Sequence, residues 1–147
     1  MNLVDQINGH KYLYLDKLQE LSDLELEIWI SEARVAEAEP GEPPENTSAY
    51  GAIITDNTCK SYKIYIKGYV AYCVTNESCG LMGEGEEFTG NLFRHYSKSK
   101  FLDFAKDSMS FEYLEEVVEK KANHIEIVCL NHIIDIICFD DFSVEEL

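Results

Sequence analysis

One segment decides the fold: His124-Ile125-Glu126-Ile127-Val128-Cys129-Leu130-Asn131-His132-Ile133-Ile134-Asp135-Ile136-Ile137-Cys138-Phe139. It is too long for one ordinary strand, and Asn131-His132 offers a two-residue turn near its middle because asparagine tolerates a positive φ. With that turn, the expected cross-strand pairs are Cys129 with Ile134, Ile127 with Ile136, and Ile125 with Cys138. This register places only apolar side chains on one face, so the segment predicts a hairpin with one buried side.

Two upstream segments show the period-two alternation of half-buried strands. In residues 24–30 the apolar face carries Leu24, Leu26, Ile28 and Ile30. The apolar parity then switches to Ala33 and Val35, which indicates a bulge or a strand end near Glu32. Residues 62–66 repeat the alternation, with an apolar face of Tyr62, Ile64 and Ile66.

Three more strands are predicted over residues 50–55, 69–75 and 86–96. Residues 69–75 are apolar on both parities, which is typical of a central strand covered on both sides. The apolar anchors of the segment 86–96 are Phe88, Leu92 and Phe93.

Helices are predicted at three places. Asp16 is followed three positions later by Gln19, a capping-box pattern that predicts a short helix over about 17–21. Ser97 or Ser99 can cap a second helix with an inward stripe of Phe101, Phe104 and Ala105. Ser110 can cap a third, with Phe111, Leu114 and Val118 facing inward.

These elements predict an α+β fold: a mostly antiparallel sheet of about six or seven strands with two or three short helices. The 147 residues are expected to form a single domain. Residues 37–48 contain every proline of the chain and several glutamates, so we expect a long exposed loop there. The acidic tail over about 140–147 is expected to be disordered.

The chain carries 28 acidic side chains against 12 lysines and arginines, a formal net charge of −16. Such a charge argues against a protein that coats nucleic acid or an anionic membrane. No signal peptide or membrane span is visible, and an odd number of cysteines (five) is typical of reduced thiols, so we expect a cytoplasmic protein. No zinc spacing or cofactor motif occurs, and we expect neither metal nor cofactor.

A few polar residues are candidates for a pocket. Asp135 lies among isoleucines, where burial would raise its pKa and make it a candidate general acid or base, with His132 three residues earlier. Glu77 ends a predicted strand, and together with Arg94 and Tyr96 it could line a cleft. The alternative is that these side chains face solvent or cap backbone groups. No catalytic residue is assigned.

Charge therefore carries the functional interpretation: a small acidic, non-enzymatic binding protein that docks on a basic protein. Immunity proteins, antitoxins and inhibitors that mimic nucleic acid share this charge and size, although no motif supports the likeness. The candidate contact residues lie in two acidic patches: Glu37, Glu39, Glu42, Glu45, Glu84, Glu86 and Glu87. The alternatives are a self-associating, homo-oligomeric module that binds a small molecule, and a small enzyme that uses Asp135, His132 and Glu77.

Overall fold

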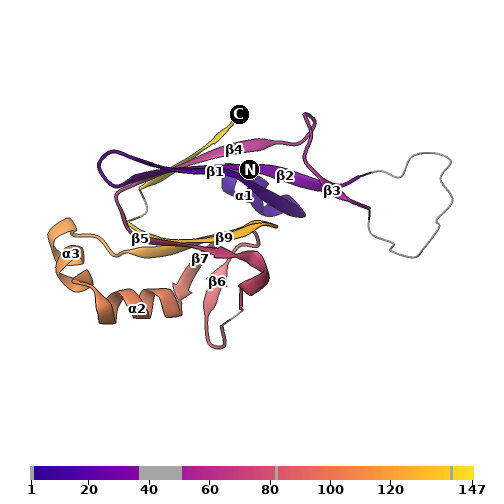
Figure 1. Cartoon of the computed structure of the whole chain (residues 1–147). Coiled ribbons are helices and arrows are strands. Elements are labelled where there is room, and N and C mark those ends of the chain that lie inside the picture. Colours follow the sequence, from indigo (N-terminus) through magenta and orange to yellow (C-terminus); the bar gives the residue numbers. More distant parts are fainter. Residues whose placement is uncertain (1, 37–50, 82, 140) are drawn as a thin grey trace, which may run out of the picture.

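The computed structural model describes residues 2–36, 51–81, 83–139 and 141–147, and it contains two antiparallel sheets of five strands each (Figure 1). The first sheet has the order β1 (Tyr12–Leu21), β2 (Glu25–Val35), β4 (Ser61–Lys67) and β10 (Phe142–Glu146), with β3 (Ile53–Ile54) paired to β2. The second has the order β5 (Tyr69–Asn76), β9 (His132–Cys138), β8 (Asn123–Val128), β7 (Phe93–Lys98) and β6 (Glu87–Thr89). The predicted α+β class with antiparallel pairing is confirmed, but the strands form two sheets rather than one.

One helix packs against the core between the sheets and two lie outside it. They are α1 (Leu3–Gly9), α2 (Lys100–Ser108) and α3 (Phe111–Val118), with a 3-10 turn, η1 (Glu77–Cys79), after β5. Figure 1 shows the two sheets stacked, with α2 and α3 on the outer side of the second sheet. Within the part of the chain that is described, no helix is long and apolar enough to cross a membrane.

The main core lies between the two sheets, and the alternation in the sequence identified it. The first sheet contributes Leu26, Ile28, Ile30, Tyr62, Ile64 and Ile66, all fully buried. The second sheet contributes Ile125, Ile127, Ile134 and Ile136, also fully buried. Each such side chain adds roughly 1.5–3 kcal/mol relative to an exposed position. A smaller cluster, which includes Ala105, Phe111 and Ile137, joins α2 and α3 to the second sheet.

The β8–β9 hairpin buries the predicted face, but its predicted register is wrong by two positions. Ile127 pairs with Ile134 and Ile125 with Ile136, because the turn is centred one residue earlier and is closed by the bond from Cys129 N to His132 O (2.9 Å). Moving the turn by one residue moves each partner by two, which keeps the same face buried. The side chain of Asn131 explains the shift: it bonds Leu15 N and Leu15 O of β1, both at 3.0 Å.

The helix predicted over residues 17–21 is wrong, because this segment is the second half of β1 and pairs with β2. Asp16 caps no helix; it lies at a register irregularity between Leu15 and Lys17, where its carboxylate accepts a hydrogen bond from Ser31 Oγ (2.6 Å). The buried positions of β2 change from even to odd numbers as expected, since both Ile30 and Ser31 are buried. The register irregularity that accompanies this change lies in β1 rather than near Glu32. Long-range pairing overrides a weak local capping pattern here.

Other predictions are corrected in the same way. The expected central strand is β5, which lies at an edge of its sheet with Cys73 and Val74 exposed. The expected disordered tail is strand β10, which pairs with β4 and packs Phe142 and Val144 against the core. The single strand predicted over 86–96 is two short strands, β6 and β7, separated by Gly90 at φ +92°.

The helices were predicted in part. Ser99 does cap α2, since its Oγ accepts a hydrogen bond from Leu102 N (3.0 Å), and Ala105 and Phe111 are buried as expected. Phe104 and Val118 are exposed instead of facing inward. Helix α1 was not predicted. The loop expected over residues 37–48 and residue 50 of the strand expected over 50–55 lie outside the described residues. In the rest of that expected strand, only the two residues of β3 are in a strand.

Candidate functional site

A cavity of about 230 Å³ opens on the outer face of the second sheet. Its floor comes from β7, β8 and β9, and residues of η1, of β6 and of the segments 80–81 and 83–86 border it. We call it the outer-face cavity; it is lined by Glu77, Gly80, Leu81, Gly83, Glu86, Phe88, Arg94, Tyr96, Glu126, Val128 and Ile133. In β8 and β9 the floor residues alternate with core isoleucines, and in β7 Arg94 follows the core residue Phe93, which directs them away from the sheet–sheet core.

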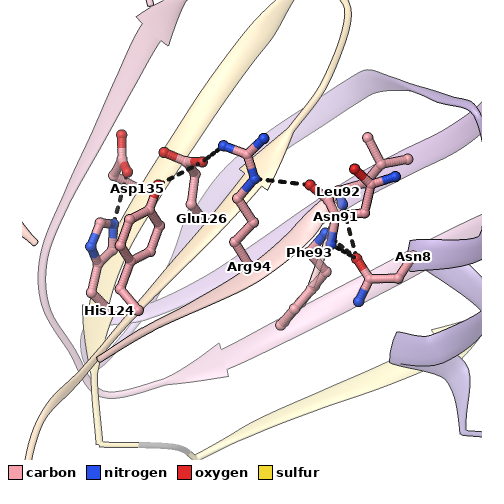
Figure 2. Close-up of polar contacts among 9 residues, drawn as sticks. Asn8, Asn91, Leu92, Phe93, Arg94, His124, Glu126 and Asp135 are labelled. Carbon is pink, nitrogen blue, oxygen red and sulfur yellow. Dashed lines mark hydrogen bonds and ion pairs between the residues drawn. The ribbon is translucent and has the colours of Figure 1, made fainter. Parts of the chain in front are cut away.

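An ion pair lies at the floor of this cavity. Arg94 Nη1 lies 2.8 Å from Glu126 Oε1, and both side chains are largely buried. Tyr96 Oη donates a hydrogen bond to the same oxygen at 3.2 Å, and the Arg94 guanidinium lies 4.6 Å from the centre of the Phe88 ring. Figure 2 shows the pair of Arg94 and Glu126, which come from the neighbouring strands β7 and β8. Among the described residues of the lining, Arg94 is the only cationic side chain, and it is already paired with Glu126.

Helix α1 holds the loop that leads into Arg94. Asn8 Oδ1 accepts hydrogen bonds from three consecutive backbone N–H groups, Asn91 (2.8 Å), Leu92 (2.9 Å) and Phe93 (2.8 Å). Arg94 Nε in turn donates to Asn91 O at 2.9 Å, as Figure 2 shows. Asn8 thus fixes the backbone on which the Arg94 side chain is oriented.

A second polar chain continues from Glu126 under α2. Asp135 lies directly opposite Glu126 in the β8–β9 ladder, and its Oδ1 lies 2.8 Å from His124 Nε2. His124 Nδ1 lies 2.8 Å from Ser99 Oγ, and the Tyr96 ring stacks on the imidazole at 4.3 Å. Burial, together with the carboxylate of Asp135, raises the pKa of Glu126. Burial and the charge of Glu126 raise the pKa of Tyr96 to about 12.

Ser99, His124 and Asp135 are the residue types of a nucleophilic triad, but their placement favours a structural role. Ser99 is 1% exposed and does not line the outer-face cavity. Its Oγ already accepts the capping hydrogen bond from Leu102 N, and a nucleophile needs an approach path to substrate. The hydrogen-bonded series of Ser99, His124 and Asp135 therefore anchors α2 to the second sheet.

The mouth of the cavity is acidic. Glu77 and Glu86 belong to the lining, and Glu84 and Glu87 are exposed within two residues of Glu86 in the sequence. Glu86 Oε1 accepts a hydrogen bond from Lys100 N (3.0 Å), and Glu87 lies opposite Lys98 in the β6–β7 ladder. The lining therefore combines three glutamates with a single arginine.

The structure brings together some of the sequence candidates and separates others. Glu77, Arg94 and Tyr96 line one cavity, and Glu86 from the acidic candidates joins them. Asp135 lies behind Glu126 and contacts His124 rather than His132. His132 and Asp135 point to opposite faces of β9, and His132 Nδ1 is buried with no hydrogen-bond partner among the described residues. Glu37, Glu39, Glu42 and Glu45 lie outside the described residues.

Sequence reasoning missed Glu126, Phe88 and Asn8. Glu126 alternates with Ile125 and Ile127, so the pattern already placed it on the face opposite the core. Its pairing with Arg94 depends on the β7–β8 register, which no local pattern specifies.

A second depression, of about 470 Å³, lies over α2 and α3 and is lined entirely by lysine and glutamate side chains: Lys106, Glu112, Glu115, Glu116, Glu119, Lys120 and Lys121. Opposite charges there already meet, as in the pair Lys121 Nζ–Glu115 Oε2 at 2.8 Å. It offers no apolar wall, so it is the weaker candidate for recognition. Among the described residues, no group of three His, Cys, Asp or Glu side chains is arranged to hold a metal ion.

Comparison with protein-family models, with curated proteins and with solved structures finds no match to this chain. Its function is therefore argued from the outer-face cavity and the charge around it.

Proposed function

We propose that this protein is a non-enzymatic binding protein that docks on a basic protein and receives one lysine or arginine side chain of that partner in the outer-face cavity. The observation that carries the proposal is the charge of the lining. Glu77 and Glu86 stand at the mouth, while Arg94 is already paired with Glu126. An incoming cation would therefore meet carboxylates without a competing free base.

The size of the cavity supports a side chain rather than a cofactor. Its volume of about 230 Å³ is below the range of roughly 300–1,000 Å³ that is usual for small-molecule sites. Phe88, Val128 and Ile133 supply apolar wall, which suits the methylene stem of a long cationic side chain. Such an anchor in a pocket with a charged rim is a common arrangement in protein interfaces.

The net charge of −16 adds long-range attraction for a basic partner. Complementary charge accelerates association and fixes orientation, and salt weakens both effects. Immunity proteins, antitoxins and inhibitors of basic nucleases are the classes that fit this mode of binding, and the proposal extends to that group.

The test compares two triple variants of equal charge. Glu77→Gln/Glu84→Gln/Glu86→Gln neutralises the mouth, and Gln at position 86 still offers an oxygen to Lys100 N. Glu112→Gln/Glu116→Gln/Glu119→Gln, on and beside α3, is the matched control. Each exposed charge contributes about 0.5 kcal/mol to binding. The loss of three charges should therefore make the mouth variant bind a captured partner roughly tenfold more weakly than the control.

Tagged wild-type protein and both variants are used to capture partners from the native cell, and the captured protein is eluted with increasing salt. The proposal expects a basic protein that the control retains, that the mouth variant loses, and that elutes at moderate salt. Equal retention by both variants, or capture of an acidic partner only, would count against it.

A defined ligand gives an independent measurement. Arginine amide is titrated into isotopically labelled protein while the methyl signals of Val128 and Ile133 are followed by NMR. These signals should shift with arginine amide, more weakly with the mouth variant, and not with acetate. Shifts that are the same for both triple variants would contradict the cavity as the binding site.

A further inference from the structure

Among the described residues, five strands have a hydrogen-bonded neighbour on one side only: β1, β3, β5, β6 and β10. Four of them are protected against pairing with another chain, and β3 is protected because it is only two residues long. β1 carries Asp16, Lys17 and Glu20 and a register irregularity at Asp16. β10 is short and carries Glu145 and Glu146, while β6 has only three residues, one of them Glu87. Charges, irregular pairing and short length are the usual means by which a protein prevents edge-to-edge association.

The remaining edge strand, β5, lacks these protections over most of its length. Its sequence Tyr69–Asn76 contains no charged residue and no proline, and it pairs with β9 on one side only. A register irregularity between Tyr69 and Ala71 leaves Ala71–Asn76 as a regular stretch. Val74 is 42% exposed and Cys73 is exposed, so the side chains along this edge are accessible as well as the backbone.

We infer that β5 is a dimerisation edge, at which β5 of a second copy of this chain pairs antiparallel and joins the two second sheets into one continuous sheet. Two identical antiparallel strands are related by a two-fold axis that passes beside one residue, which then faces its own counterpart. The middle of the regular stretch places this axis at Cys73 or at Val74. The inference does not depend on the function proposed above.

Charge distinguishes β5 from the longer edge strands β1 and β10 as the place where two copies can meet. Two chains of charge −16 repel each other, so they can associate closely only where the meeting surfaces carry no like charges. Self-pairing of β10 would bring Glu145 and Glu146 against their counterparts, and self-pairing of β1 would bring Asp16 and Glu20 together. Self-pairing of β5 brings no charged residue of the strand itself against its counterpart. The carboxylate of Glu20 that reaches β5 accepts hydrogen bonds from Tyr69 Oη and Tyr72 Oη at 2.8 and 2.9 Å, toward the start of the strand.

The first test measures mass by sedimentation velocity and light scattering over a wide dilution series with reductant present. Wild type and Cys73→Ser should be dimers that dissociate on dilution. Cys73→Lys places two lysines near each other across the edge and should weaken the dimer roughly fivefold or more. Tyr14→Lys is the matched control, because Tyr14 is 43% exposed on β1 and the added charge is the same.

The direction of the change in dimer affinity distinguishes pairing at β5 from a general effect of charge. Both lysine variants reduce the negative charge of each copy, so general repulsion falls in both, and only pairing at β5 predicts that Cys73→Lys dissociates. A monomer at all concentrations overturns the inference, and so does a dimer that Cys73→Lys leaves unchanged.

Cross-linking supplies a second measurement that does not depend on the lysine variant. Residues directly opposite in an antiparallel pair have Cα atoms about 4.5–5.5 Å apart, which lies within disulfide range. In a Cys79→Ser background, mild oxidation should cross-link either Cys73 or, in a Cys73→Ser/Val74→Cys variant, the new cysteine. If neither position cross-links, β5 is not the dimer edge.

Discussion

Replacing Asn8 with alanine removes one side-chain oxygen that serves three backbone donors. The N–H groups of Asn91, Leu92 and Phe93 lie 2.8, 2.9 and 2.8 Å from Asn8 Oδ1, and Leu92 and Phe93 are buried residues. A buried donor left without a partner costs about 1–3 kcal/mol, whereas an exposed donor finds water. With two part-buried donors and one exposed donor, Asn8→Ala should lower the free energy of unfolding by about 3 kcal/mol.

Asn2→Ala is the matched control because it removes the same amide from the same helix. Asn2 Oδ1 caps α1 through a single exposed bond to Asp5 N (2.8 Å), and losing such a cap costs about 1 kcal/mol. Urea unfolding, followed by the fluorescence of Trp29 (the only tryptophan), gives both free energies if the slope m is unchanged. A cost for Asn8→Ala that does not exceed that of Asn2→Ala would refute the reasoning.

Three further predictions concern the polar contacts between elements. Asn131→Ala removes both bonds to Leu15 and should cost about 1–3 kcal/mol in urea unfolding; no loss of stability would show that these bonds are dispensable. Ser99→Ala removes the cap of α2 and the contact with His124, and should cost about 1–2 kcal/mol while partner binding stays unchanged, which calorimetry with a captured partner can check. The pKa of Glu126 is raised in the folded state, so protonation of Glu126 favours the folded protein. This contribution to stability is fully present below about pH 4.5 and is lost as the pH rises through the raised pKa. Glu126→Gln should therefore flatten the fall of stability with pH over that window, and an unchanged pH profile would contradict the assigned shift.

The buried faces could be predicted from the sequence because they depend on local alternation. Leu26, Ile28 and Ile30 are buried, as are Tyr62, Ile64 and Ile66, because one period-two pattern can bury only one face of a strand. The prediction of Leu24 on the same face is wrong: Leu24 lies in the turn before β2 and is 60% exposed. The same pattern could not predict that residues 17–21 extend a strand. Their pairing with β2 is a long-range interaction that the local capping pattern does not contain.

The candidate site also contains residues that could be predicted from the sequence and residues that could not. Glu77, Arg94 and Tyr96 could be grouped because strand ends and mixed polar and aromatic residues are common at sites. Glu126 and Asn8 could not, since each acts through a partner distant in sequence: Glu126 through Arg94, and Asn8 through the loop that begins at Asn91. The turn of the hairpin was misplaced for the same reason, because Asn131 bonds Leu15, 116 positions away.

The Asn131–Leu15 contact also bears on how the sandwich opens. The chain passes between the sheets twice at one end, through Gly68 between β4 and β5 and again between β9 and β10, where Lys67 N bonds Asp141 O at 2.8 Å. The pairings of β5 with β9 and of β1 with β2 place Asn131 and Leu15 at the opposite end. Covalent connections therefore hinge the two layers at one end, while hydrogen bonds close the other. Amide hydrogen exchange should accordingly report partial opening first at Leu15, well before the strands near Gly68 lose protection.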